Sequence, residues 1–358
     1  ENRIIYFYWL KMVDSFKLEG HVNFRERIAI SIFSQKKILI TQIRKNFFLS
    51  GLRKYEIDLL SLTDKLTHES YIQINEAGTI ICFNPGNLLD SNVLQKISSL
   101  RPLSYYLEFI FYLILLNERR TEIKLLGLRA LNLDISVENL IYVIIPLFRK
   151  LGIKEIRIKI FTNFFSSKIN TELILFSSRF SPKKDFHITQ AGILTKLRLI
   201  FTFSSNFITF INQLENLFDD YFNLSRMDYK FYKVKIPNKN IQFKTFSLIG
   251  ESSTGCILGG DFTLVSFGQR NSFIKNKIFK IYQTILDEFD SGSCISGQNQ
   301  FFLLFKMLIA GKSNQRSICL GKLTIKAIQF FRDIKRIFGI FFCIRPFYNK
   351  KTILIKLI

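Results

Sequence analysis

Hydrophobic and polar positions alternate along the first part of the chain in two different periods. The segments 36–43, 71–75 and 79–83 are rich in β-branched residues and predict strands. Between them, residues 51–66 place apolar side chains three or four positions apart, which is the spacing of one helix face. The side chains on this face are Leu52, Tyr55, Leu59, Leu62 and Leu66. The pattern therefore predicts a helix flanked by strands.

The same alternation returns in the next stretch of chain. We expect a helix at about 102–116, a strand at 121–128, a second helix at 137–152 and a strand at 155–161. Pro146 lies inside the second helix and predicts a kink, because proline lacks a backbone N–H. The recurrence favours an α/β fold of repeated α+β units over one doubly wound parallel sheet.

From about residue 186 the pattern changes. A strand at 195–203 is followed by a predicted helix and by two further strands, 229–236 and 243–250, with basic outward positions. The apolar face of this helix would consist of Phe207, Ile211, Leu214 and Phe218. This order of elements indicates a small separate module.

Helical periodicity resumes after Gly268, in the segment 271–289. We therefore expect a small α/β domain at 186–268 to be inserted into a larger domain. The first part of the larger domain would be residues 1–185, and its final part residues 269–358.

The composition adds a charge imbalance to this picture. The 358-residue chain carries 51 Lys and Arg against 28 Asp and Glu, a formal net charge of +23. A surface of this charge is typical of nucleic-acid-binding proteins, since neutralisation of phosphates drives such binding. The alternative is a genome rich in A and T, which would enrich Lys along with Phe and Ile without any selection for RNA binding.

Cysteines and histidines indicate no metal site. Five Cys without a CxxC pair and three widely separated His favour a reducing compartment and give no zinc signature. The most apolar run, 102–116, is shorter than the roughly 20 residues that span a bilayer, and it contains Glu108. We therefore expect a buried core helix there and no membrane segment.

Five blocks of sequence, in order along nearly the whole chain, resemble one known family. They read KLEGHVNFRERIAISIFSQKKILITQIR, GLRKYEIDLLSLTDKLT, IYVIIPLFRKLGI, GESSTGCILGGD and GSCISGQNQ with the later FFRDIKRIF. The family is that of the RNA 3'-terminal phosphate cyclases, and several of these blocks are similar to its non-cyclase, ribosome-biogenesis branch. The resemblance implies a main domain of three repeated units, each with two helices on a four-stranded sheet, and a small α/β insert.

The resemblance also indicates where a nucleophile would stand. Cyclases attach AMP to a histidine in a His-x-x-Asp-Gln context, and the matching position here is Ser296, a hydroxyl with no base beside it in the sequence. The cyclases' glycine-rich opening corresponds to EGHV at 19–22 in this chain, where Cβ atoms would crowd a phosphate. A later glycine-rich turn of the cyclases corresponds to FFSSKIN at 164–170. We therefore expect no cyclase activity and no cofactor. The turn at Ser296 is then a helix-capping turn or a vestigial anion pocket.

A basic helix is predicted around Arg332, Asp333, Lys335 and Arg336. Cleavage of RNA without a metal needs a base and a cation, and the resemblance implies that Arg332, Asp333 and Lys335 are the suspected catalytic segment. The alternatives are phosphate or partner contact, or a plain helix surface in which Asp333 pairs with Arg336. The inward face would consist of Ile328, Phe331, Ile334 and Phe338.

Three further arginines are candidates for RNA phosphate contact together with Arg336. Arg25 and Arg27 lie in the block that matches the cyclases' glycine-rich opening, and Arg53 begins a later block. Each could instead form a buried structural pair, with Glu26 or Glu56 as the acidic partner. The sequence leaves both interpretations open.

The resemblance implies a nucleolar factor for small-subunit ribosome assembly and early precursor-rRNA processing. Its expected location is the nucleus and nucleolus. Its expected partners are a GTPase assembly factor, precursor rRNA and other components of the small-subunit processome, and it would act mainly by binding RNA and protein. The alternative is a metal-independent endonuclease that cleaves precursor rRNA.

Overall fold

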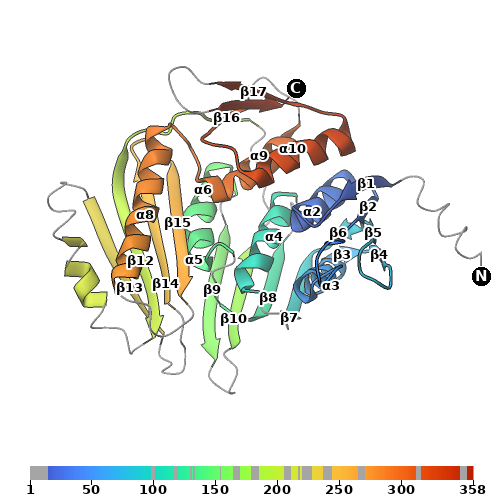
Figure 1. The fold of residues 1–358 in the computed structure, drawn as a ribbon, viewed down its shortest axis with the longest axis horizontal. Helices are drawn as coiled ribbons and strands as arrows, with labels where there is room; N and C mark the ends of the chain where they lie inside the picture. The colour runs from blue at the N-terminus through green and yellow to red at the C-terminus, as the bar shows by residue number, and fades with distance from the viewer. Residues whose placement is uncertain are drawn as a thin grey trace, which may run out of the picture.

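The structure is a computed structural model that describes most of the chain. The described residues are 15–97, 101–116, 120–129, 131, 134–153, 155–163, 170–178, 185–204, 211–216, 218–219, 228–236, 244–264, 271–311, 316–346 and 353–357. Residues 164–169 of the expected turn, and Phe207 of the predicted insert helix, lie outside them. The described residues form a mixed α/β fold in which helices are interspersed among short runs of strands (Figure 1).

The first repeated unit places two helices on a four-stranded sheet. Its strands lie in the order β1-β2-β5-β4; β1 is parallel to β2, and the other pairs are antiparallel. Parallel neighbours need a crossover connection, which α2 provides. The elements are β1 (Phe16–Glu19), α2 (Phe24–Ser34), β2 (Ile38–Thr41), α3 (Lys54–Leu66), β4 (Tyr71–Ile74) and β5 (Ile81–Asn84), with the short antiparallel pair β3 (Thr67–His68) and β6 (Asn87–Leu88).

The second unit repeats this arrangement. Its strand order, β7-β8-β10-β9, has the same single parallel pair and the same antiparallel pairs as the first. The distortion expected at Pro146 is present as a π-helical segment just before it, because proline removes one helical hydrogen bond. The elements are β7 (Ser91–Lys96), α4 (Leu103–Leu116), β8 (Thr121–Gly127), α5 (Val137–Asn139), η1 (Leu140–Ile144), α6 (Ile145–Lys150), β9 (Ile156–Asn163) and β10 (Asn170–Ser177).

The third unit has the order β11-β16-β18-β17, again with one parallel and two antiparallel pairs. Its elements are β11 (Phe186–Ile188), α9 (Gln300–Ala310), β16 (Arg316–Leu320), α10 (Ile325–Phe338), β17 (Phe342–Pro346) and β18 (Ile353–Leu357). The expected α/β fold, with three units of two helices on a four-stranded sheet, is therefore confirmed.

A fourth sheet interrupts the third unit between β11 and α9, and its strand order is β13-β12-β14-β15. Its own core includes three side chains of the predicted insert helix, namely Ile211, Leu214 and Phe218. The elements are β12 (Leu194–Ser204), β13 (Asp228–Ile236), β14 (Lys244–Ser252), β15 (Ile257–Leu264) and α8 (Asn271–Asp290).

Packing groups two elements differently from the boundaries predicted from the sequence. Strand β11 pairs with β16 in the third main sheet, although it falls inside the predicted insert at 186–268. Helix α8 falls in the predicted final part at 269–358, yet Ile274, Ile278 and Ile285 belong to the core of the fourth sheet. Both differences have one cause: a run of sequence shows which face of an element is apolar, but not which sheet that face covers.

The helices of the three units share one hydrophobic core. Helix α4 is buried along nearly its whole length, since Leu103 to Leu115 are all buried, as the apolar run at 102–116 predicted. In Figure 1, α4 lies between the blue first unit and the green second unit, and the red α9 lies above it. Within the described residues, none of the helices combines the length and the apolar character that crossing a membrane requires.

Candidate functional site

Ser296, the position that matches the cyclases' histidine, lies in the turn between α8 and α9. Its hydroxyl is buried and accepts hydrogen bonds from the Gly259 backbone N–H and from the Asn299 amide, both at 3.2 Å. The next helical segment, η3 (Gly297–Asn299), receives no capping hydrogen bond from the Ser296 side chain. Ser296 therefore joins the turn to β15 of the fourth sheet, and its oxygen is engaged in structure.

A cavity of about 460 Å³ opens beside this turn and is lined by both signs of charge. The cations are Arg25 and Lys326, whereas the carboxylates are Glu26, Glu108, Asp134 and Asp261. Burial raises the pKa of Asp261 to about 6, and its oxygens accept hydrogen bonds from the Ser136 N–H at 2.5 Å and from Gln298 at 3.2 Å. The four carboxylates outnumber the two cations in this lining, so the cavity does not present a concentrated positive charge to a nucleoside triphosphate.

Arg25 faces this cavity but is committed to internal contacts. Its guanidinium donates to the Tyr105 carbonyl at 2.8 Å and pairs with Glu108 at 2.8 Å, while Glu26 lies 3.8 Å away. Burial by itself lowers the pKa of Arg25, and the two carboxylates outweigh this and hold it well above its usual value. The structure therefore places Arg25 in a buried pair, one of the two interpretations that the sequence left open.

Arg27 and Asp333 form a second buried pair, which joins α2 to α10. The guanidinium approaches the two Asp333 oxygens at 2.7 and 3.2 Å, and both side chains are 1% exposed. Arg27 also donates to the carbonyls of Glu19 and Gly20, and Gln329 donates to Asp333 at 2.9 Å. Asp333 therefore pairs with Arg27 rather than with Arg336, and both of its carboxylate oxygens accept hydrogen bonds.

The inward face of α10 agrees with the prediction in part. Ile334 is buried, and Phe331 and Phe338 pack half-buried against the core, whereas Ile328 is 41% exposed. The other buried residues of the helix are Ala327, Phe330, Asp333 and Ile337. The pairing with Arg27 turns the Asp333 position toward the core, which apolar periodicity alone could not indicate. Arg332, Lys335 and Arg336 are exposed, as predicted.

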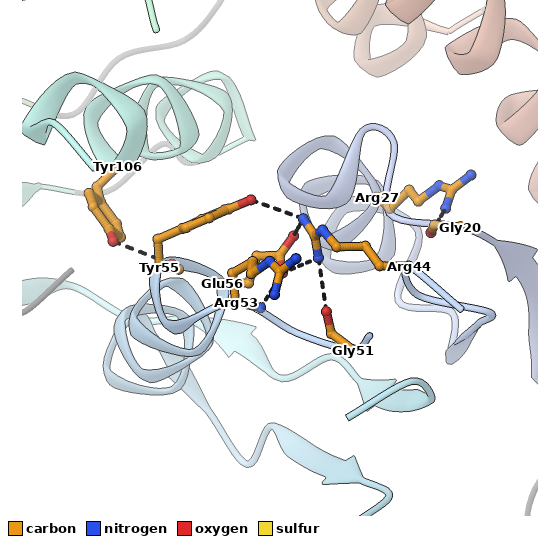
Figure 2. A network of polar contacts seen from close by, with 8 residues as sticks. All are labelled: Gly20, Arg27, Arg44, Gly51, Arg53, Tyr55, Glu56 and Tyr106. Atoms are coloured by element: carbon orange, nitrogen blue, oxygen red, sulfur yellow. Dashed lines mark hydrogen bonds and ion pairs between the residues drawn. The ribbon is translucent and has the colours of Figure 1, made fainter. Parts of the chain in front are cut away.

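Arg53 lies half-buried at the start of α3, beside a network that the sequence did not reveal (Figure 2). Glu56 accepts the Arg53 backbone N–H at 2.7 Å, but its carboxylate pairs with Arg44 through two contacts of 2.7 Å. Arg44 also donates to the Tyr55 hydroxyl at 2.9 Å. The sequence signal for these contacts was weak, since Arg44 merely follows a predicted strand. Glu108, a lone charge in an apolar run, was the clearer sign of a buried ion pair.

Glu288 provides a test of the Ser296 turn. Its carboxylate accepts the Gly297 N–H at 2.8 Å, and burial raises its pKa to about 7. A carboxyl whose pKa is raised by folding favours the folded state below its unfolded pKa, near 4.5, and that contribution is lost as the pH rises through 7. We expect Glu288→Gln to match the wild type at pH 4.5 and to increase the free energy of unfolding by on the order of 2 kcal/mol at pH 8.

Urea unfolding of both proteins from pH 4.5 to 8 checks this expectation. The matched control is Asp290→Asn, which removes an exposed carboxylate from the same helix. A difference between Glu288→Gln and the wild type that stays constant with pH would show that Glu288 is not a buried titrating group.

Comparisons with known proteins agree with this fold. A family described as "RNA 3'-terminal phosphate cyclase" matches residues 16–344. A "Probable RNA 3'-terminal phosphate cyclase-like protein" of Dictyostelium discoideum is 26% identical, over 94% of this chain and 95% of its own length. The human "RNA 3'-terminal phosphate cyclase-like protein" is 26% identical over 89% and 87%. The "rRNA processing protein rcl1" of Schizosaccharomyces pombe is 22% identical over 90% of each chain.

Proposed function

This chain belongs to the RNA 3'-terminal phosphate cyclase family, and we propose that it acts in rRNA processing as an RNA- and protein-binding factor without cyclase activity. One observation carries the proposal. The position of the family's nucleophile holds Ser296, whose buried hydroxyl is fixed by Gly259 and Asn299. Both partners are hydrogen-bond donors, so neither can take the proton of the serine hydroxyl, which is a weaker nucleophile than an imidazole.

The names of the relatives support the processing role. Relatives across nearly the full length are named cyclase-like proteins, and two fungal relatives are named rRNA processing proteins. We extend the proposal to the nucleus and nucleolus, to small-subunit assembly, and to a GTPase assembly factor as a partner within the processome. Affinity purification of the tagged chain, followed by identification of the bound proteins and RNA, tests this extension.

The exposed face of α10 is the part of the surface that we propose for RNA contact. Arg332, Lys335 and Arg336 project from it, and an electrostatic contact with three phosphates makes binding steeply dependent on salt. The endonuclease alternative has less support, because both Asp333 oxygens are held by Arg27 and Gln329. A base in that position would first have to leave its buried pair.

Replacing the three exposed residues tests the RNA contact. We expect Arg332→Ala, Lys335→Ala and Arg336→Ala, combined, to weaken binding to a precursor-rRNA fragment about tenfold. The slope of log K against log salt should also fall by about 2, at roughly 0.7 per phosphate. Fluorescence anisotropy at several salt concentrations measures both quantities.

The control is a second triple variant of equal charge from the fourth-sheet region. Lys196→Ala, Lys277→Ala and Lys280→Ala remove three exposed lysines far from α10 in the sequence. Equal losses in the two triple variants would mean that binding follows net charge rather than the α10 face. In a separate test, labelled ATP should leave no covalent adduct on the wild-type protein, and a stable adduct would overturn the non-cyclase assignment.

A further inference from the structure

The loop between β2 and α3 presents large apolar side chains to solvent. Phe48 is fully exposed, and its neighbours Phe47 and Leu49 are 57% and 61% exposed. Burial of a phenylalanine normally contributes favourably to folding, and these two consecutive rings leave much of that contribution unused. Exposed apolar groups gathered in this way are characteristic of interaction sites.

The loop is held in place at its base. The Gly51 N–H donates to the Ile43 carbonyl at 2.9 Å, and buried Arg44 donates to the Gly51 carbonyl at 3.2 Å. Gly51 has a φ of +80°, and a Cβ there would lie 2.4 Å from the Ala77 carbonyl oxygen, so this closure requires glycine. Figure 2 shows Arg44 reaching both Gly51 and Glu56. A preordered loop loses little conformational entropy when it binds a ligand.

Basic residues flank the two rings along the chain. Lys45 and Lys54 are exposed, and Arg53 is half-buried at the start of α3. His21 makes a T-shaped contact with the Phe47 ring at 5.6 Å. Burial lowers the pKa of His21, and nearby arginines, Arg44 first, lower it further against the opposing effect of Glu56.

The segment that contacts Phe47 through His21 also contacts the amino-terminal end of α10. Asn23, two residues after His21, donates its amide to the Lys326 carbonyl at 2.8 Å. Val22, between His21 and Asn23, is 41% exposed. Lys326 itself is exposed and adds a further cation at this end of the helix.

From these observations we propose that Phe47 and Phe48 form a stacking platform for unpaired RNA bases. Lys45, Arg53 and Lys54 would contact the neighbouring phosphates. In single-stranded nucleic acid, bases can stack on aromatic rings while the phosphates between them contact neighbouring cations. Proteins that bind single strands without sequence preference combine these two kinds of contact. A protein partner that docked through apolar contacts alone would not need the flanking cations. The inference rests on the proposed RNA-binding function and assigns a specific site to it.

The test uses the full chain and a labelled 12-nucleotide oligouridine. We expect Phe47→Ala with Phe48→Ala to weaken binding about 10- to 100-fold, since losing the stacking of a base on an aromatic ring weakens binding by about this factor. The salt slope should not change, because no phosphate contact is removed. Lys45→Ala with Lys54→Ala should instead lower the slope by about 1.4. Phe161→Ala, which removes an exposed ring from β9, is the matched control and should bind as the wild type does.

Two further measurements separate stacking from apolar contact. Phe47→Leu with Phe48→Leu keeps the apolar surface but removes the π-systems, so we expect it to lose binding as the alanine variant does. A backbone probe with abasic sites should bind the wild type and the alanine variant equally. Thermal unfolding confirms that each variant is folded.

Each outcome supports the platform or overturns it. If the leucine variant binds like the wild type, the rings are not stacked on bases, and an apolar protein partner is the better occupant. If the alanine variant binds like the wild type, the loop is not an RNA site, although salt-dependent binding elsewhere would leave the proposed function standing. If the wild type binds no RNA at all, the proposed function fails together with the platform.

Discussion

Asp333→Ala is expected to lower the free energy of unfolding by about 3–5 kcal/mol, because it leaves the Arg27 guanidinium buried without its carboxylate. A domain of ordinary stability has only about 5–15 kcal/mol in total. The variant should therefore be partly unfolded in a cell, and its loss of function would follow from that. Urea unfolding with an unchanged m-value measures the effect.

A double replacement provides the decisive comparison. Arg27→Met with Asp333→Leu removes both charges and keeps apolar volume, so most of the lost stability should return. Arg332→Ala is the control, since Arg332 is exposed next to Asp333 and should change stability by less than about 0.5 kcal/mol. A fully stable Asp333→Ala protein that has lost its activity in rRNA processing would contradict the structural role and revive the catalytic one.

The Arg27–Asp333 pair also shows a limit of structure prediction from the sequence. Arg27 and Asp333 are 306 positions apart, and periodicity near Asp333 described an exposed position on a helix. Only the contact between α2 and α10 brings the two charges together. The same limit applies to Arg44 and Glu56, whose pairing depends on how the β2–α3 loop closes.

Elements with strong local patterns were predicted well. The apolar run of α4, the helix at 51–66 and the interruption at Pro146 all depend on neighbours within one or two turns. Order along the chain then suggested the three units. The assignment of β11 and α8 to their sheets depended on pairing across long separations, and there the predicted boundaries and the packing differ.

In the candidate site too, local features could be predicted from the sequence and long-range contacts could not. The loss of the family's histidine was visible at Ser296, since one position decides it. The hydrogen bonds around Asp261 could not be predicted, because Asp261, Gln298 and Ser136 come from three separate segments. Phe47 and Phe48 were equally obscure, since an apolar pair in the sequence is usually part of the core.

The second large effect is expected from Phe302→Ala in α9. Phe302 is fully buried, and its ring centroid lies 4.9 Å from that of Tyr112, 5.7 Å from that of Phe148 and 6.3 Å from that of Phe111. These partners come from α4 and α6 of the second unit, so the ring packs the third unit against the second. Truncation leaves a cavity in close-packed surroundings and should lower the free energy of unfolding by about 3–5 kcal/mol.

Phe302→Leu separates apolar volume from ring geometry. It keeps most of the volume and loses the three ring contacts, so we expect a loss of about 1–2 kcal/mol. Exposed Phe161→Ala should change stability by less than about 0.5 kcal/mol. Helix α9 begins at Gln300, directly after the Ser296 turn, so the same packing helps to position that turn. If the wild type itself unfolded in two separate transitions, or if Phe302→Ala were as stable as the wild type, the shared core could not be what positions the turn.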